Sequence, residues 1–269
     1  MTATDKLFAG SIPELYDRLL VPLIFEAYAQ DLAERIAITR PQAVLETAAG
    51  TGVLTSAMAS RLPAQSRIVA SDLNQPMLDR AATKRGLEGR ITWRQADALA
   101  LPFEDRAFDV VACQFGVMFF PDKVKGYSEA RRVLRPGGRF FFSAWDRISE
   151  NEFGETVNDA VAAFLPNDPP AFMARTPHGY HNVEKIREDL TAAGFTDISV
   201  TTIDHVSKAA SPRDVAVGFC QGTPLRNEIE ARGASLEAAT KAAAAALAKR
   251  FGNGPIEGRI SAHIVAATA

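Results

Sequence analysis

The stretch VLETAAGTGVLT, Val44 to Thr55, is a short apolar run that ends in a glycine-rich turn. Its first residues, Val44–Glu46, predict a buried strand, and Val53–Arg61 predict the helix that follows. A glycine-rich turn between a strand and a helix lets the backbone approach a nucleotide closely. The stretch therefore predicts an α/β unit of the kind that binds nucleotides.

Strands and helices alternate around this turn, from Pro41 to Trp145. Five strands joined by helices predict a doubly wound, mostly parallel sheet with helices on both faces and right-handed crossovers. Two connecting helices are expected, one over 74–86 and one that stops at the RPGG turn, 135–138. The strands expected after the first are RIVASD (67–72), ITWRQAD (91–97), FDVVACQF (108–115) and RFFFSAWD (139–146).

The chain after Trp145 is less regular. Four prolines between residues 148 and 177 predict loop and short helix over the edge of the sheet. No linker divides the chain, so we expect a single domain over 1–269. The elements expected at this end are a helix over 182–195, a sixth strand over 197–206, helices over 211–250 and a last strand over 258–269.

Composition excludes several classes of protein. The formal net charge of -2 gives no basic surface for the phosphates of a nucleic acid. The two cysteines, Cys113 and Cys220, lie far apart in sequence, which favours free thiols in a reducing cytoplasm. The first residues lack the pattern of a secretion signal, and the apolar run at 19–29 is too short to span a bilayer. We therefore expect a cytoplasmic protein without membrane insertion.

Two interpretations of the glycine-rich turn compete. As a dinucleotide fingerprint it supplies Gly50 and Gly52, but Thr55 stands where a third glycine or an alanine is usual. Asp72 ends the second strand, where a carboxylate can accept hydrogen bonds from both ribose hydroxyls. An acid about twenty residues after the turn suits either interpretation. The turn and Asp72 alone therefore do not decide between them.

The segments further along the chain carry a more specific pattern. ADALALPFEDRAFDVV spans 96–111, and ARRVLRPGGRFFFSAW spans 130–145. With the turn, they resemble the class I S-adenosylmethionine-dependent methyltransferases, in the ubiquinone and menaquinone biosynthesis branch (methyltransferase type 11-like), over about Val44–Trp145. The resemblance implies a Rossmann-like sheet of seven strands with the last one antiparallel. It also implies S-adenosyl-L-methionine as the cofactor and direct displacement of its methyl group by a small-molecule acceptor.

Two alternatives stay open at this point. One is an NAD(P)-dependent oxidoreductase, which Thr55 and the pattern at Asp97 disfavour. The other is a non-catalytic protein that keeps the methyltransferase fold and the cofactor site. The acceptor itself is not identified, because the resemblance is carried by the cofactor half of the chain.

The resemblance implies roles at the methionine and ribose end of the cofactor. The carboxylate of Glu46 is expected near the methionine ammonium, directly or through water. Gly50 and Gly52 would let the backbone approach the cofactor closely. Asp72 would bind the ribose hydroxyls.

Other residues are implied around the adenine. Leu73 and Met77 would pack on the face of the ring, although both residue types are also common in plain core. Asp97 would accept a hydrogen bond from the adenine amino group, while the amide of Ala98 donates to the ring. An aspartate here can also merely form a turn. The remaining expected cofactor residues, at the end of the fourth strand, are Gln114 and Phe115.

Ala48 departs from the family pattern, which has glycine at this position. Alanine tolerates left-handed dihedral angles poorly. We therefore expect Ala48 to have a negative φ, or the loop to be shifted, and its methyl group to hold the cofactor slightly further away.

Catalysis in this class often needs no nucleophile on the protein, because the sulfonium is already activated. A general base is required only if the acceptor arrives protonated. The segment TPHGYHN offers His178, Tyr180 and His181, of which His181 is the candidate base. A loop histidine that only caps or forms a hydrogen bond is the alternative. No cluster of residues predicts a metal site.

The acceptor is expected to enter above the carboxyl edge of the sheet. Three segments would cover it there: Phe8–Tyr28, Phe164–His181 and Val215–Arg226. The aromatic residues expected to face it are Phe8, Tyr16, Phe172, Tyr180 and Phe219. The expected division is an N-terminal helical lid (1–40), a cofactor-binding core (41–147), variable covering segments (148–194 and 207–255) and the last two strands (195–206 and 256–269).

Overall fold

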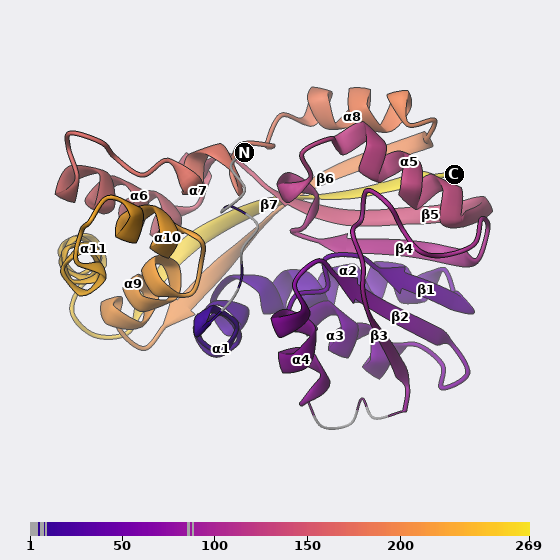
Figure 1. Ribbon diagram of the computed structural model, residues 1–269, viewed down its shortest axis with the longest axis horizontal. Helices are drawn as coiled ribbons and strands as arrows, with labels where there is room; N and C mark the ends of the chain where they lie inside the picture. The colour runs from indigo at the N-terminus through magenta and orange to yellow at the C-terminus, as the bar shows by residue number, and fades with distance from the viewer. Residues whose placement is uncertain (1–4, 6–7, 9, 85–86, 88) are drawn as a thin grey trace.

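The strands form one seven-stranded sheet (Figure 1) in the order β3-β2-β1-β4-β5-β7-β6. The computed structural model describes residues 5, 8, 10–84, 87 and 89–269. The predicted α/β sheet is confirmed, including its antiparallel last strand. The strands are β1 Ala43–Glu46, β2 Arg67–Asp72, β3 Ile91–Gln95, β4 Phe108–Gln114, β5 Leu134–Trp145, β6 Thr196–Ala209 and β7 Ile256–Thr268.

Five neighbouring strands run parallel. β1 lies at their centre, with Leu45 opposite Val69 of β2 on one side and Val111 of β4 on the other. β7 pairs antiparallel with both β5 and β6. Since parallel strands end at the same edge, the carboxyl ends of β1 to β5 meet there, which is where ligands bind in open α/β sheets.

Helices cover both faces of the sheet. In Figure 1, α2, α3 and α4 lie on one face and α5 and α8 on the other. Tyr28, Leu32 and Ile36 of α2 recur at the spacing of one helical face, and each is fully buried. The helices that cover the sheet are α2 Glu26–Ile38, α3 Val53–Arg61, α4 Gln75–Ala82, α5 Lys123–Val133 and α8 Val183–Ala192.

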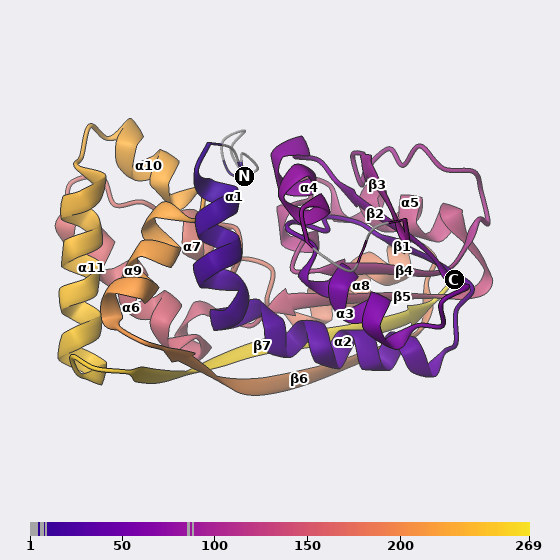
Figure 2. The ribbon, with the colours of Figure 1, turned by 90° about the horizontal axis from the view of Figure 1, so that it is seen from below.

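The remaining helices form a separate group beside the carboxyl edge. Strands β6 and β7 extend beyond the other strands and reach this group (Figure 2). Between it and the sheet lie the helix α1, Ile12–Leu15, and the π-helical segment Tyr16–Phe25. We call the group the cap: α6 Glu152–Phe164, α7 Phe172–Arg175, α9 Pro212–Gln221, α10 Leu225–Ala231 and α11 Leu236–Phe251.

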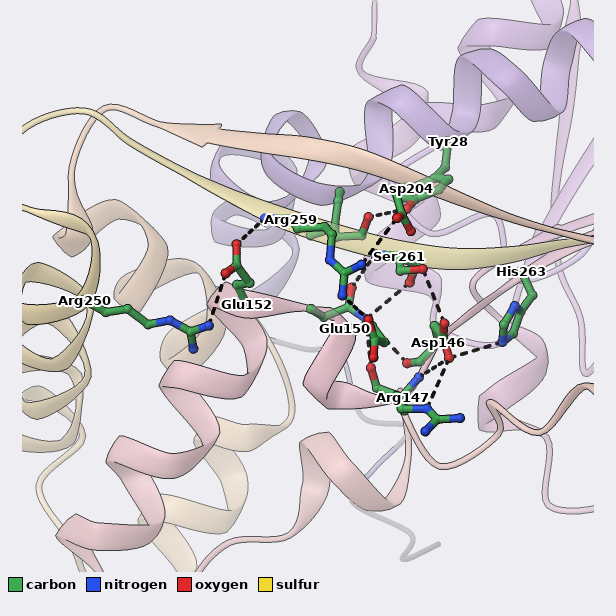
Figure 3. Close-up of polar contacts among 12 residues, drawn as sticks. Tyr28, Asp146, Arg147, Glu150, Glu152, Asp204, Arg250, Arg259, Ser261 and His263 are labelled. Carbon is green, nitrogen blue, oxygen red and sulfur yellow. Dashed lines mark hydrogen bonds and ion pairs between the residues drawn. The ribbon is translucent and has the colours of Figure 1, made fainter.

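Ion pairs attach the start of α6 to the β6–β7 hairpin (Figure 3). The side chain of Arg259 on β7 pairs with Glu150 and, at 3.4 Å, with Asp204 on β6. The backbone N–H of Arg259 donates to Glu152 at 2.7 Å, and Glu152 also pairs with Arg250 of α11 at 3.2 Å. These contacts bind the cap to the hairpin at the point where the hairpin leaves the core.

Two expectations about secondary structure were wrong. Residues 148–177 were expected as loop and short helix, but α6 is a regular helix of 13 residues. Its buried residues Phe153, Val157 and Val161 recur at helical spacing, and the prolines begin only after the helix ends. The RPGG segment lies within β5 rather than in a turn before it. There β5 bulges, because Phe108 pairs with Leu134 while Val110 pairs with Arg139.

The helix expected over 74–86 is shorter in the structure. Helix α4 ends at Ala82, and Gly86, the expected end, lies outside the described residues. Asn74 stands at the N-cap position but its side chain caps no helical N–H. Instead its carbonyl oxygen accepts from the backbone N–H of Phe8 at 3.3 Å. No helix in the described part of the chain is long and apolar enough to cross a bilayer.

Candidate active site

A cavity opens at the carboxyl edge of the sheet, between the core and the cap. Each of the five parallel strands contributes to it at or just after its end. These contributions are Ala48, Asp72, Asp97, Phe115 and Trp145, in the order of the strands. All the predicted cofactor residues line the cavity except Glu46 and Gly52. The topology therefore gathers at one place residues that are far apart in sequence.

Asp72 is the acid at the centre of this edge. It is only 7% exposed, and its carboxylate accepts from the backbone N–H of Gly50 at 2.9 Å and of Asn74 at 2.8 Å. Burial raises the pKa of Asp72 above its ordinary value, although these donors oppose the rise. The side-chain amide of Asn74 also donates to Oδ1, at 3.4 Å. A ribose hydroxyl would therefore replace this long contact at Oδ1 or use the remaining lone pair of Oδ2. The ribose role of Asp72 stays a prediction.

The expectation of a negative φ at Ala48 was wrong. Its φ is +52°, so alanine adopts here the left-handed conformation usual for glycine. The surroundings explain how the methyl group is accommodated. A Cβ on Gly116 would lie only 2.4 Å from the Cβ of Ala48, so the absence of a side chain at Gly116 leaves the room that this methyl group needs. Gly116, just after the neighbouring strand β4, thus leaves room for the methyl group of a left-handed Ala48.

The expected adenine residues lie together on the cavity. Leu73 is 43% exposed, whereas Met77 beside it is buried. Asp97 accepts from the backbone N–H of Leu99 at 2.9 Å through one oxygen, so it does form a turn. Its other oxygen accepts no hydrogen bond from the described residues and remains available to a ligand. The adenine contacts of Leu73, Met77, Asp97 and Ala98 stay predictions.

Glu46 and Gly52 lie behind the cavity wall. The carboxylate of Glu46 accepts from the hydroxyl of Thr55 at 2.5 Å, and burial raises the pKa of Glu46 to about 8. Gly52 has a φ of +78°, and a Cβ there would lie 3.0 Å from Trp93. Thr55, the residue that departs from a dinucleotide fingerprint, is thus the hydrogen-bond partner of Glu46. The expected contact of Glu46 with the methionine ammonium stays a prediction.

An aromatic wall lines the other part of the cavity. The rings of Phe115 and Trp145 stack with centroids 3.9 Å apart, and Phe25 packs against both. Phe115 has a φ of +50°, which is rare for a bulky residue and typical of functional sites. From Phe25 the wall continues through Tyr16, Phe8, Phe119 and Phe172.

Sequence reasoning missed Trp145. The sequence did contain a signal for it. Trp145 is the last residue of the fifth strand, and residues at the carboxyl ends of parallel strands commonly line the site. Phe119 and Phe25 carried no comparable signal. Their place in the wall depends on how helical segments pack against the sheet.

The three covering segments do contribute to the cavity, as expected. Phe8, Tyr16, Phe172 and Phe219 line it. Tyr180 does not line it. Its hydroxyl donates to Asp189 at 2.7 Å, within a buried group away from the cavity.

The two histidines of the TPHGYHN segment differ in position. His181, the candidate base, is not among the cavity-lining residues, and its Nδ1 lies 2.8 Å from the backbone oxygen of His178. The base role of His181 stays a prediction. His178 does line the cavity and is only 6% exposed.

Comparison with known proteins agrees with this geometry. Residues 44–138 match the model of a family described as a methyltransferase domain. A demethylmenaquinone methyltransferase of Deinococcus radiodurans is 35% identical over 205 residues, which cover 72% of this chain and 85% of the relative. A demethylmenaquinone methyltransferase of Thermus thermophilus is 40% identical over 206 residues, covering 68% and 87%.

The chain belongs to the class I S-adenosylmethionine-dependent methyltransferases. It is a methyltransferase that uses S-adenosyl-L-methionine as the methyl donor and acts on a small molecule. This decides against the oxidoreductase and the non-catalytic protein. Among solved structures, a phosphoethanolamine N-methyltransferase 2 of Haemonchus contortus in complex with S-adenosyl-L-methionine shares the fold. Its TM-score is 0.60 at 18% identity, with 95% of this chain and 56% of that chain covered.

Proposed function

We propose that this methyltransferase methylates a hydroxylated aromatic ring of the quinol type. The observation that carries the proposal is the aromatic wall, which begins with Phe115 and Trp145 at the strand ends and continues over the N-terminal segment to α7. Aromatic side chains favour offset or edge-to-face contacts with a further ring. The names of the Deinococcus and Thermus relatives agree with such an acceptor.

The polar groups on the acceptor side also favour an uncharged ligand. Asn151 donates through its amide to the backbone oxygen of Ser261 at 3.2 Å and accepts from the Ser261 N–H at 3.1 Å. The hydroxyl of Thr223 donates to the oxygen of Phe219 at 2.7 Å. Among the described lining residues there is no lysine or arginine for an anionic acceptor, and the carboxylates belong to the expected cofactor side.

When bound, S-adenosyl-L-methionine supplies a methyl group already activated on a sulfonium. The residues of this chain then have two tasks. The carboxyl edge fixes the cofactor through Asp72 and the turn at Gly50, and the aromatic wall holds the acceptor ring and excludes water. With the acceptor atom aligned, the acceptor–methyl bond would form as the methyl–sulfur bond breaks, S-adenosylhomocysteine would leave and the acceptor would lose one proton, without a nucleophile on the protein.

The test is methyl transfer to a short-chain demethylmenaquinol by the purified protein with S-adenosyl-L-methionine. Formation of S-adenosylhomocysteine and of the methylated ring is followed by mass spectrometry. Histamine and phosphoethanolamine serve as polar controls. Methylation of the quinol alone is the expected result, and methylation of a polar amine without the quinol contradicts the proposal.

We also infer that the protein works in a reducing, cytoplasmic compartment. Cys113 and Cys220 are both free and buried. Burial raises the pKa of each thiol to about 12, so both stay protonated and unreactive.

A further inference from the structure

The ring of His178 is held in one tautomer. Its Nδ1 lies 2.8 Å from the backbone oxygen of Asp146, the residue that follows β5. A carbonyl oxygen can only accept, so Nδ1 carries the hydrogen. That carbonyl is itself held in place, since the N–H of Asp146 donates to the oxygen of Ser261 at 3.1 Å and the Asp146 carboxylate lies among the contacts drawn in Figure 3.

The other nitrogen of this ring is consequently an acceptor. Nε2 of His178 has no hydrogen-bond partner among the described residues, although only 6% of the residue is exposed. Gly154 also lines the cavity, and a Cβ there would lie 3.6 Å from Nε2, so this glycine places no side chain against the nitrogen. Burial lowers the pKa of His178 to about 4, so the ring is neutral near pH 7 and its lone pair is available.

Other polar side chains on the acceptor side differ from His178. Asn151 and Thr223 are engaged with backbone groups, as described above. The hydroxyl of Tyr16 has no partner among the described residues, but a hydroxyl can donate as well as accept. A neutral imidazole whose Nδ1 hydrogen is already engaged can only accept at Nε2. It therefore discriminates between ligands that present a donor and ligands that do not.

We propose that His178 binds the methyl acceptor, with Nε2 accepting a hydrogen bond from a hydroxyl group on the acceptor ring. This rests on the proposed function, since it requires an aromatic ring in the cavity. Trp145 lies beside the histidine, with ring centroids 6.0 Å apart, so a ring packed on the aromatic wall has its substituents within the reach of His178. His178 thereby selects an acceptor that carries O–H over one that carries only a carbonyl oxygen at this position.

The first experiment compares 1-naphthol with naphthalene as probes. Their dissociation constants are measured by calorimetry with saturating S-adenosylhomocysteine, for the wild type and for His178→Phe. The matched control is His205→Phe, because Nε2 of His205 is also without a partner but His205 does not line the cavity. The preference for 1-naphthol over naphthalene should fall roughly 3- to 10-fold in His178→Phe and stay unchanged in the control.

An equal preference in all three proteins overturns the role of His178 and leaves the aromatic acceptor standing. If the wild type binds neither probe, the aromatic acceptor itself is wrong, and the role of His178 falls with it. The two failures are therefore distinguishable.

A second experiment measures the protonation of the histidine rings in the wild-type protein. The chain has four histidines, so ¹⁵N spectra of histidine-labelled wild type are simple to read. His178 and His181 should both carry the hydrogen on Nδ1, since each Nδ1 lies 2.8 Å from a carbonyl oxygen. Of these two rings, only the unprotonated Nε2 of His178, identified by the resonance lost in His178→Phe, should move when 1-naphthol is added, and it should not move when naphthalene is added. A His178 ring protonated at Nε2, or a resonance that ignores 1-naphthol, overturns the proposal.

Discussion

The two sides of the cavity are built in different ways. The cofactor side consists of strand ends and the turns that follow them, with the buried carboxylate of Asp72 and tight hydrogen bonds such as the one that it accepts from the N–H of Gly50. The acceptor side joins the strand-end rings of Phe115 and Trp145 to helical segments from distant parts of the chain, and most of its lining residues are aromatic or aliphatic.

This difference separates two kinds of specificity. The cofactor side binds by directed polar contacts, so removal of one group leaves its partner unsatisfied and has a large cost. The acceptor side binds by burial of apolar area, to which each ring adds a modest amount. Single substitutions should therefore act sharply on the first side and gradually on the second.

The largest effect is expected for Asp72→Ala. The expected ribose role of Asp72 predicts that the loss of two charge-assisted hydrogen bonds weakens cofactor binding by about 1.5–3 kcal/mol, measured by calorimetry on the folded variant. Phe119→Leu on the acceptor side is the control, with unchanged cofactor affinity and weaker binding of 1-naphthol. Unchanged affinity in Asp72→Ala would show that β2 does not end at the ribose.

The next effect concerns the fit between Gly116 and Ala48. A methyl group at Gly116 would lie 2.4 Å from the Cβ of Ala48 and 2.7 Å from the sulfur of Cys113. Gly116→Ala should lower the free energy of unfolding by about 1–3 kcal/mol in urea titrations, as overpacking does. Adding Ala48→Gly should recover part of the loss, because it removes the closest contact. Strictly additive changes in the double variant would contradict the steric explanation.

Glu46 should give the apo protein a pH-dependent stability. Its pKa is raised from 4.5 to about 8, so between these values the folded protein holds a proton that the unfolded chain has lost. The contribution of Glu46 to stability is therefore greatest below pH 4.5 and is lost as the pH rises toward 8. Glu46→Gln should be more stable than wild type at pH 8, on the order of 1–2 kcal/mol, and differ little at pH 4.5. Parallel pH profiles of unfolding for the two proteins would refute this.

The smallest effect is expected for Ala48→Gly alone. Glycine adopts a φ near +52° without strain, so the loop should keep its geometry. Cofactor affinity should be equal to wild type or slightly better, within about 0.5 kcal/mol by calorimetry. A large loss would mean that the methyl group packs against something essential to the site.

Much of the cofactor side was predictable, because its features are local. A strand that ends in an acid and a glycine-rich turn are both visible in short segments, which is why Asp72 and Leu73 could be expected at the cavity that they line. The φ of Ala48 was not predictable from the turn itself. It depends on Gly116, which follows a different strand.

The acceptor side was predicted only as a set of segments. Tyr180 was expected on the cavity but is packed against Tyr127 and Asp189 instead. His178 and His181 are three residues apart in the same segment, and the packing of their loop against Asp146 and β7 decides which one lines the cavity. Such choices depend on tertiary contacts that no short stretch of sequence contains.

The β6–β7 hairpin bears on how related enzymes can differ in substrate specificity. Ala209, the last residue of β6, is paired with Ile256, the first residue of β7. The whole segment 210–255, with α9, α10 and α11, thus leaves and re-enters the sheet at a single pair of neighbouring residues. A different segment inserted between Ala209 and Ile256 would change the acceptor side without moving the parallel strands whose ends form the cofactor side.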